Sequence, residues 1–319
     1  MMTLSKLAKL AHVSLSTASK AFSMSSDVNE ETREMIFDLA RKHDCFKKFY
    51  NAKYPRFVIA VICPEFRSRY YSSLISAIGE NLDKLGCEVC VASTDFSSKT
   101  CRELYDYYNN YSKVDGIIMV DSFKENIEDN NVPVVTGGSA RGKAISVRSS
   151  SSDGVMMAVD YLIKQNVKDI GFIGETHTAS KLKVFKEYMH QKGQNVNINH
   201  IAVSEDRMEL GGYNAMSEIL KRGDLPRAIL CAYDCIAIGA IKCIFDNGLM
   251  VPEDIAIIGI NNNRESEYLN PPLSSVDLRL EEVGKEMAVA MVNQLLGKEC
   301  KKEIKITPKL IIRKSSEIQ

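Results

Sequence analysis

From Phe57 onward the chain alternates short apolar runs with longer amphipathic segments, and this rhythm restricts the fold more than any other feature. Val and Ile fill the runs with little polar alternation, which is typical of parallel strands covered on both faces. The segments between the runs carry apolar residues at helical spacing. The runs are, in order, "FVIAVICP", "EVCVAST", "VDGIIMVD", "VPVVTGG", "DIGFIG", "HIAVS", "AILCAYD", "DIAIIGINN" and "LSSVD". We therefore predict an α/β body of two doubly wound parallel-sheet subdomains, with a ligand crevice beyond the carboxyl ends of the strands.

Length and composition predict a soluble protein of two or three domains. The chain has 319 residues, of which 45% are hydrophobic and 26% charged, as in ordinary globular proteins. Its most apolar long stretch, "AILCAYDCIAIGAI", is interrupted by Asp234 and is too short to span a bilayer. The polar N-terminus lacks the apolar region of a signal peptide. We therefore expect a cytoplasmic protein that makes no use of a membrane.

The cysteines predict free thiols rather than a metal site. Their number, nine, is odd, and several lie inside apolar runs. Cys87 and Cys90 are three residues apart, but they share a predicted strand, so their side chains point to opposite faces. We expect reduced thiols, no bound metal and no cofactor.

No catalytic motif stands out. The sequence has no phosphate-binding P-loop, no GxSxG and no HExxH, and the glycines of "GFIGE" and "GGSARG" lack dinucleotide-binding spacing. The five histidines are scattered on polar segments and are expected at the surface: His12, His43, His177, His190 and His200. The chain is therefore not predicted to be an enzyme, and we assign no catalytic residue.

The first 56 residues differ in charge from the rest. They carry ten Lys and Arg against six Asp and Glu, a formal charge of +4, and this leaves −4 for the body because the whole chain is neutral. A basic head on an acidic body is typical of a nucleic-acid-binding module joined to a regulatory domain. On charge alone, a solvated lysine-rich face remains the alternative.

Three short helices are predicted in this head. In "TLSKLAKLA" the apolar residues recur at helical spacing, and Thr3 can cap the first helix. A break follows at His12, where the turn requires a left-handed backbone. The second helix begins at Ser14, and a third covers "VNEETREMIFDLARKH" with Asn29 as its N-cap. This arrangement predicts a helix-turn-helix unit, and the alternative is a small helical cap packed on the body.

The second helix keeps a polar, non-acidic face that fits DNA. With Ser14 as cap, Leu15, Ser16 and Lys20 are placed to meet base edges in a major groove. The hydroxyls of Thr17 and Ser19 suit phosphate oxygens, as do the lysines of the following basic segment. The predicted DNA-binding residues are Thr3, Ser14, Leu15, Ser16, Thr17, Ser19, Lys20, Lys47, Lys48 and Lys53.

The motif residues of the head are Thr3, Ala8, Ala11, Val13, Ser14, Thr17, Ser19, Val28, Thr32 and Arg33. With them the chain resembles the N-terminal headpiece of the LacI/GalR family of bacterial transcription regulators. The resemblance continues in the body at "VDGII", "GGYNAM", "NGLMVPEDIAIIGINN", "NPPLSSVDLRLEEVG" and "LIIRKSS". It implies a helix-turn-helix followed by a periplasmic-binding-protein-like effector domain. The implied domains are a headpiece at 1–46, a basic linker at 47–56 and a body at 57–319. Within the body, the N-subdomain takes about 57–162 and 277–305, and the C-subdomain about 163–276 and 306–319.

The resemblance also implies a repressor that binds a near-palindromic DNA operator. Because no heptad repeat precedes Gln319, we expect a homodimer rather than a coiled-coil tetramer. The family's hinge helix carries an Ala-Arg-x-Leu core that has no clear counterpart here. Either Phe49, Tyr50 or Tyr54 supplies the minor-groove wedge, or the linker is a plain basic tether.

Nine effector-binding positions follow from the same resemblance: Ser68, Arg69, Tyr70, Tyr71, Ser150, Lys181, Tyr233, Asp234 and Asn261. At several of them a neutral or cationic group replaces a family carboxylate. We therefore predict a phosphorylated or acidic effector, such as a sugar derivative, rather than a plain neutral sugar. The alternatives are a degenerate pocket without a ligand, or a solute-binding protein that does not regulate DNA.

Overall fold

The computed structural model describes residues 2–23, 25–50, 57–121, 131–139 and 142–318. Its first part is a headpiece of four helices: α1 (Leu4–Leu10), α2 (Leu15–Phe22), α3 (Glu30–Lys42) and the short α4 (Phe46–Phe49). The expected caps are present, since Thr3, Ser14 and Asn29 each accept a backbone N–H of the helix that follows. His12 has a φ of 53°, the left-handed backbone predicted for the turn between α1 and α2.

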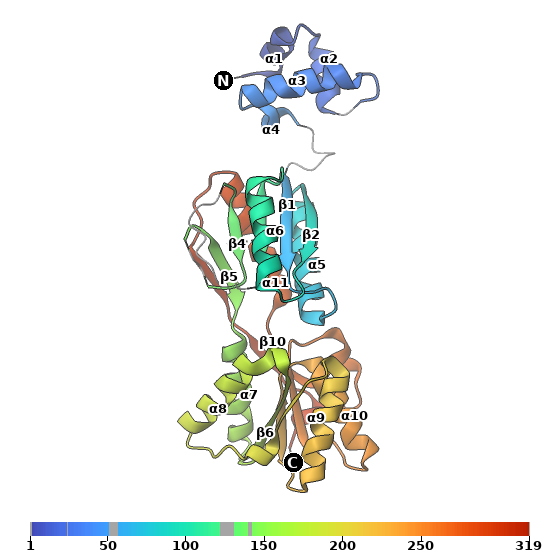
Figure 1. The fold of residues 1–319 in the computed structure, drawn as a ribbon, viewed down its shortest axis with the longest axis vertical. Coiled ribbons are helices and arrows are strands. Elements are labelled where there is room, and N and C mark those ends of the chain that lie inside the picture. Colours follow the sequence, from blue (N-terminus) through green and yellow to red (C-terminus); the bar gives the residue numbers. More distant parts are fainter. Residues whose placement is uncertain (1, 24, 51–56, 122–130, 140–141, 319) are drawn as a thin grey trace.

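Two lobes form the body below the headpiece (Figure 1). The first lobe contains a fully parallel sheet in the order β11-β5-β4-β3-β1-β2. Helices α5 and α11 pack on one face, and α6 packs on the other. Its elements are β1 (Phe57–Cys63), α5 (Arg69–Lys84), β2 (Cys87–Ser93), α6 (Ser98–Asn110), β3 (Gly116–Met119), β4 (Val134–Thr136), β5 (Ile145–Ser149), α11 (Leu280–Leu295) and β11 (Glu303–Ile306).

The second lobe has the sheet order β12-β10-β9-β8-β6-β7, parallel except for the β10–β12 pair. The chain passes between the lobes after β5, after β10 and after β11. The elements of this lobe are α7 (Ser151–Lys164), β6 (Ile170–Glu175), α8 (Ala179–Gln191), β7 (Ile201–Ser204), α9 (Met208–Arg222), β8 (Ala228–Cys231), α10 (Asp234–Asp246), β9 (Ala256–Ile260), β10 (Ser274–Asp277) and β12 (Lys309–Ile311). Short 3-10 turns lie at Thr176–Thr178, Ile198–His200, Arg264–Tyr268 and Lys314–Ser316.

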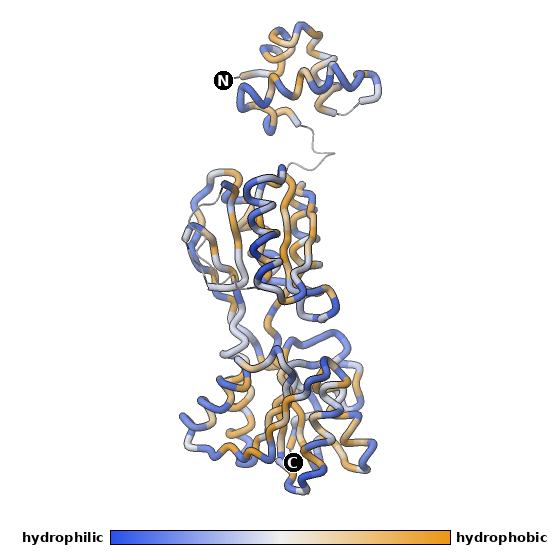
Figure 2. The backbone as a smooth tube through the Cα atoms, in the orientation of Figure 1, coloured by the Kyte–Doolittle hydropathy of each residue, from blue (hydrophilic) through white to orange (hydrophobic). Residues whose placement is uncertain are grey.

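The predicted α/β body is confirmed, and burial explains it. Strand β1 is buried at six of its seven positions, and β6, β8 and β9 are buried throughout, so the apolar runs need cover on both faces. Apolar segments fill the interior of each lobe while hydrophilic segments lie on the outer helices (Figure 2). Cys87 and Cys90 pack into apolar clusters on opposite faces of the first sheet, as predicted.

Several details differ from the predictions. Strands β5, β11 and β12 and the short helix α4 were not expected. Helix α7 packs on the second sheet through Val155, Val159 and Leu162, so the chain first changes lobe near residue 150 rather than at 162. His200 is not a surface residue, since it is 3% exposed at the start of β7. Among the described helices, none combines the length and the hydrophobicity needed to cross a bilayer.

Candidate functional site

Helix α2 presents the surface predicted to meet DNA. Ala18, Ala21 and Phe22 are fully or almost fully buried against the other headpiece helices. This orientation leaves Ser16, Ser19 and Lys20 exposed, together with Leu15, whose side chain is 52% exposed in spite of being apolar. The predicted base-reading residues Leu15, Ser16 and Lys20 therefore share the outward side of one helix.

Among the predicted DNA contacts at α2, Ser14, Thr17 and Lys20 already have partners within the headpiece. The Lys20 ammonium lies 2.7 Å from an Asp27 carboxylate oxygen, and this ion pair lowers the pKa of Asp27. The Ser14 hydroxyl caps α2 and is 2.8 Å from the Thr17 hydroxyl. Because these groups are exposed, each can exchange its partner for a base or a phosphate at modest cost.

Two lysines of the basic segment after α3, predicted to contact phosphates, have partners within the protein. The Lys47 ammonium is 3.0 Å from Asp115 of the first lobe and lies over the Phe57 ring, while Lys48 donates to the Met2 carbonyl oxygen at 2.9 Å. In this conformation both lysines hold parts of the protein together instead of facing a phosphate. Lys53 falls outside the described residues.

Phe49 and Tyr50 are poorly placed to be a minor-groove wedge. Both rings are half-buried against the headpiece core, with Phe49 5.8 Å from the Phe22 ring and Tyr50 4.9 Å from the Phe46 ring. Exposing either ring would remove apolar contacts from a small core. Tyr54, the third candidate, lies outside the described residues.

The second candidate site is a cavity of about 320 Å³ between the two lobes. Its walls come from segments that follow the carboxyl ends of strands in both sheets, where ligands bind in doubly wound folds. The lining includes Tyr70 and Tyr71 at the start of α5, Phe96 after β2, and Tyr233 after β8. Aromatic rings thus form much of the wall.

Seven of the nine predicted effector positions line this cavity: Ser68, Arg69, Tyr70, Tyr71, Lys181, Tyr233 and Asn261. The other two do not. Ser150 caps α7 by accepting the Asp153 N–H, and its neighbours Ser149 and Ser151 line the wall in its place. Asp234 is fully buried behind the wall, where it accepts hydrogen bonds from Asn263, Ser266 and Ser275.

Three carboxylates that were not among the predicted effector positions belong to the cavity. Glu65, Asp121 and Glu175 all line the cavity. Each follows or ends a parallel strand, namely β1, β3 and β6. The sequence held a signal for them, because an acidic residue at the carboxyl end of such a strand points to the crevice. Phe96, His177 and Arg207 also line the cavity and were not predicted.

The cations of the cavity differ in how fully they are neutralised. Arg207 pairs with both Glu65 and Glu175, and Arg69 pairs with Glu265. Among the described residues, the Lys181 ammonium forms no hydrogen bond or ion pair, and it lies 5.7 Å from the centre of the Tyr233 ring. Lys181 is therefore the cation most available to an acidic ligand.

Burial changes the acidity of these groups. Desolvation lowers the pKa of Lys181 to about 8, and the negative charges of Glu175 and Asp121 oppose that shift. Desolvation also raises the pKa of Tyr70 to about 12 and that of Tyr233 well above its ordinary value, in the latter case with help from Glu175. Both tyrosines therefore keep their hydroxyl protons at neutral pH.

Comparisons with known proteins agree with this architecture. A family model described as a periplasmic binding protein-like domain matches residues 159–316. The HTH-type transcriptional repressor PurR of Pasteurella multocida (strain Pm70) is 27% identical over 332 positions, covering 99% of this chain and 98% of that protein. The repressor of the same name from Salmonella paratyphi B is 26% identical, with coverage of 99% and 97%.

Solved structures share the fold along the whole chain. The lac repressor dimer bound to operator and the anti-inducer ONPF has a TM-score of 0.73 at 21% identity, covering 99% of each chain. The cellobiose complex of the transcriptional regulator CelR has a TM-score of 0.69 at 23% identity, covering 99% of this chain and 100% of that one. The similarity to repressors extends from the headpiece through both lobes. The comparisons therefore support the resemblance of this chain to the LacI/GalR family of transcription regulators along its whole length.

Proposed function

We propose that this protein is an operator-binding transcription repressor whose body responds to a small-molecule effector. The observation that carries the proposal is the outward face of α2, where Leu15, Ser16 and Lys20 are exposed on a helix anchored by its buried side. Such a helix fits the major groove. The relatives matched along their length are named transcriptional repressors, and the chain is a regulator rather than an enzyme.

The assembly follows from that function. The DNA-binding unit extends through α4 to residue 50 rather than ending at 46, because Phe49 and Tyr50 pack on the headpiece core, and the residues after it link it to the body. Two copies of the chain pair so that two headpieces reach successive major grooves of a near-palindromic site. The lac repressor in the matched structure is a dimer on its operator, which supports the same arrangement here. A repressor acts where its operator is, so we place this protein in the cytoplasm.

Selection of bound DNA from a random pool tests the DNA-binding role. We expect an enriched two-fold site, and Lys20→Ala should relax one position in each half-site at a cost of about 1–3 kcal/mol, because a base-edge contact is lost. The measurement is repeated at two salt concentrations, since phosphate contacts alone would give steep salt dependence without an enriched sequence.

Lys42→Ala is the matched control for that experiment. Lys42 is an exposed lysine in the last turn of α3 rather than on α2, so its removal should leave the selected sequence unchanged. Binding without any enriched site would contradict operator recognition. Equal relaxation by both variants would show that charge, rather than the face of α2, determines the readout.

We further propose that the effector carries an acidic group that binds Lys181. The other two cationic residues of the lining, Arg69 and Arg207, are already paired with carboxylates, and the surrounding Tyr70, Tyr71 and Tyr233 rings offer stacking surfaces for a ring. Sugar phosphates and sugar acids are the first compounds to test.

Calorimetric titration with those compounds should show binding that weakens with rising pH. The pKa of Lys181 is about 8, so the protonated amine falls roughly tenfold in abundance between pH 7 and pH 9, and the affinity for an acidic ligand falls with it. Lys181→Met should remove the binding at both pH values. Lys183→Met is the control, because that neighbouring side chain is 74% exposed and pairs with Glu187. Tight binding of neutral sugars that is indifferent to Lys181 would overturn the proposal.

A further inference from the structure

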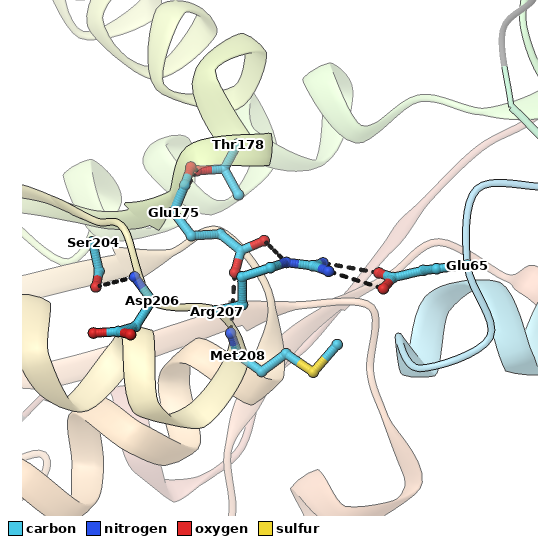
Figure 3. Close-up of polar contacts among 7 residues, drawn as sticks. All are labelled: Glu65, Glu175, Thr178, Ser204, Asp206, Arg207 and Met208. Atoms are coloured by element: carbon cyan, nitrogen blue, oxygen red, sulfur yellow. Dashed lines mark hydrogen bonds and ion pairs between the residues drawn. The ribbon is translucent and has the colours of Figure 1, made fainter. Parts of the chain in front are cut away.

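Arg207 forms an ion pair across the cleft from one lobe to the other. It lies just before α9 in the second lobe, whereas Glu65 follows β1 in the first. The Arg207 Nη1 and Nη2 atoms are 2.9 and 2.8 Å from the two carboxylate oxygens of Glu65 (Figure 3). This is the bidentate geometry in which a guanidinium binds a carboxylate most strongly.

Glu175 fixes Arg207 in place from its own lobe. Its side chain is fully buried at the end of β6, with one oxygen 3.1 Å from Arg207 Nε and the other accepting the Met208 N–H at 3.0 Å (Figure 3). The Thr178 hydroxyl accepts a hydrogen bond from the Glu175 backbone N–H and donates one to the Glu175 carbonyl oxygen. These two bonds fix the end of β6. The guanidinium is therefore held toward the first lobe by a residue of its own lobe.

Low exposure makes this pair different from a surface salt bridge. The Glu65 side chain is 7% exposed and that of Arg207 31%, whereas another inter-lobe pair, Arg69–Glu265, is 60% and 45% exposed. Exposed pairs contribute little because water screens them. A shielded guanidinium with two carboxylates keeps far more of its Coulombic attraction, and removing one member leaves a buried charge without its partner.

An aromatic contact supports the same closure. The Phe96 ring of the first lobe stacks on the His177 ring of the second, with centroids 4.1 Å apart and planes 12° from parallel, and the Arg207 guanidinium lies 5.4 Å from the Phe96 centroid. Asp95 and Phe96 both have positive φ, at 49° and 58°, in the loop that projects this ring. Two adjacent non-glycine residues in that region cost conformational energy, which the contact of Phe96 with the opposite lobe offsets.

We propose that Glu65, Arg207 and Glu175 act as an internal clamp that holds the two lobes closed without any effector. In a two-lobed binding protein, a ligand closes the cleft by contacting both lobes at once. Here the protein supplies that bridging contact itself. The body is thus closed before any effector binds. An effector therefore acts on a body that is already closed and does not cause the closure. This inference rests on the proposed function, because it concerns the regulation of the same cleft.

Small-angle X-ray scattering of the full-length protein without ligand tests the clamp. Arg207→Met keeps the aliphatic stem and removes the guanidinium, and Glu65→Gln keeps the shape and removes the charge from the opposite lobe. We expect each variant to have a larger radius of gyration than the wild type, with faster hydrogen exchange in residues 64–68 and 205–209. The double variant should open no further than either single one, because both changes break the same contact.

Two other variants serve as controls. Arg148→Met breaks the Arg148–Glu303 pair, which joins β5 and β11 within one lobe, so it should leave the scattering unchanged. Arg69→Met breaks the exposed inter-lobe pair and should have a much smaller effect than Arg207→Met. Scattering of Arg207→Met or Glu65→Gln that superimposes on that of the wild type overturns the clamp. This result is independent of DNA binding, whereas failure to select an operator would overturn the proposed function and leave the scattering result standing.

Discussion

Replacing Phe37 by alanine is expected to unfold the headpiece while the body stays folded. Phe37 is 4% exposed on α3, and its ring lies 5.3 Å from that of Phe22, 4.9 Å from that of Phe46 and 5.9 Å from that of Tyr50. Removing a buried Phe side chain costs about 3–5 kcal/mol. A core this small supplies only a few kcal/mol in total, so the loss should exceed its stability.

Hydrogen exchange resolved by peptide measures this outcome directly. In Phe37→Ala, amides of α1 to α3 should lose their protection while those of β6, β8 and β9 keep it, and operator affinity should fall to the non-specific level. Met35→Ala is the control, since Met35 is 43% exposed on the same helix and its removal should change stability by less than about 0.5 kcal/mol. Wild-type protection and operator binding in Phe37→Ala would show that the aromatic cluster is not what holds the headpiece together.

The fold was predictable where burial and sequence pattern coincide. Strands β1, β6, β8 and β9 are continuous apolar runs because both of their faces are covered, and such runs are visible without any structure. Strand β5 was missed because its apolar part is only Ile145 and Val147 before a run of serines begins. The position of α7 was misjudged for a different reason, since a helix between two sheets has an apolar face that fits either one.

The cleft was only partly predictable, for reasons that differ between residues. Glu65, Asp121 and Glu175 each stand at the end of a predicted strand, so the rule that placed the ligand crevice was sufficient to find them. Arg207 had no comparable signal, because its partner Glu65 is 142 residues away in the sequence and belongs to the other lobe. A pairing of that kind depends on how the two lobes meet.

The basic segment after the headpiece shows a related limit. Charge and position favour phosphate contacts for Lys47, and the sequence contains nothing that predicts its pairing with Asp115. The acidic partner is itself held in place by the Val58 N–H, which donates to the other carboxylate oxygen of Asp115 at 2.9 Å. The partners of a lysine at a domain boundary are thus set by the tertiary structure.

Asp234→Ala is expected to destabilise the body strongly, although the family resemblance places this residue in the effector site. Its carboxylate accepts from the Ser275 hydroxyl at 2.6 Å, the Asn263 N–H at 2.6 Å and the Ser266 hydroxyl at 2.8 Å, and it is fully buried. It thereby ties α10 to the segment after β9 and to β10. Alanine would leave three buried donors without an acceptor, for a loss of about 3–5 kcal/mol, measured by denaturant unfolding of the body.

Tyr233→Phe is the control for a change at the adjacent residue. Tyr233 lines the cavity, so losing its hydroxyl should affect ligand binding and leave the unfolding free energy within about 0.5 kcal/mol of the wild type. The reverse pattern, an Asp234→Ala protein that is stable but fails to bind effector, would show that Asp234 contacts the ligand.

The pH dependence of unfolding gives an independent test of Asp234. Burial outweighs the three donors and the charge of Arg313, and raises the pKa of Asp234 to about 7 in the folded protein, against 3.8 for an ordinary aspartate. A raised folded pKa means that the folded state holds the proton more tightly than the unfolded chain does. Its contribution to stability is thus fully present below about pH 4 and is lost as the pH rises toward 7.

Asp234→Asn cannot ionise, so the wild type should lose a few kcal/mol of unfolding free energy relative to this variant between about pH 4 and 7. Parallel stability curves for the two proteins would show that Asp234 ionises in the folded body as it does in the unfolded chain.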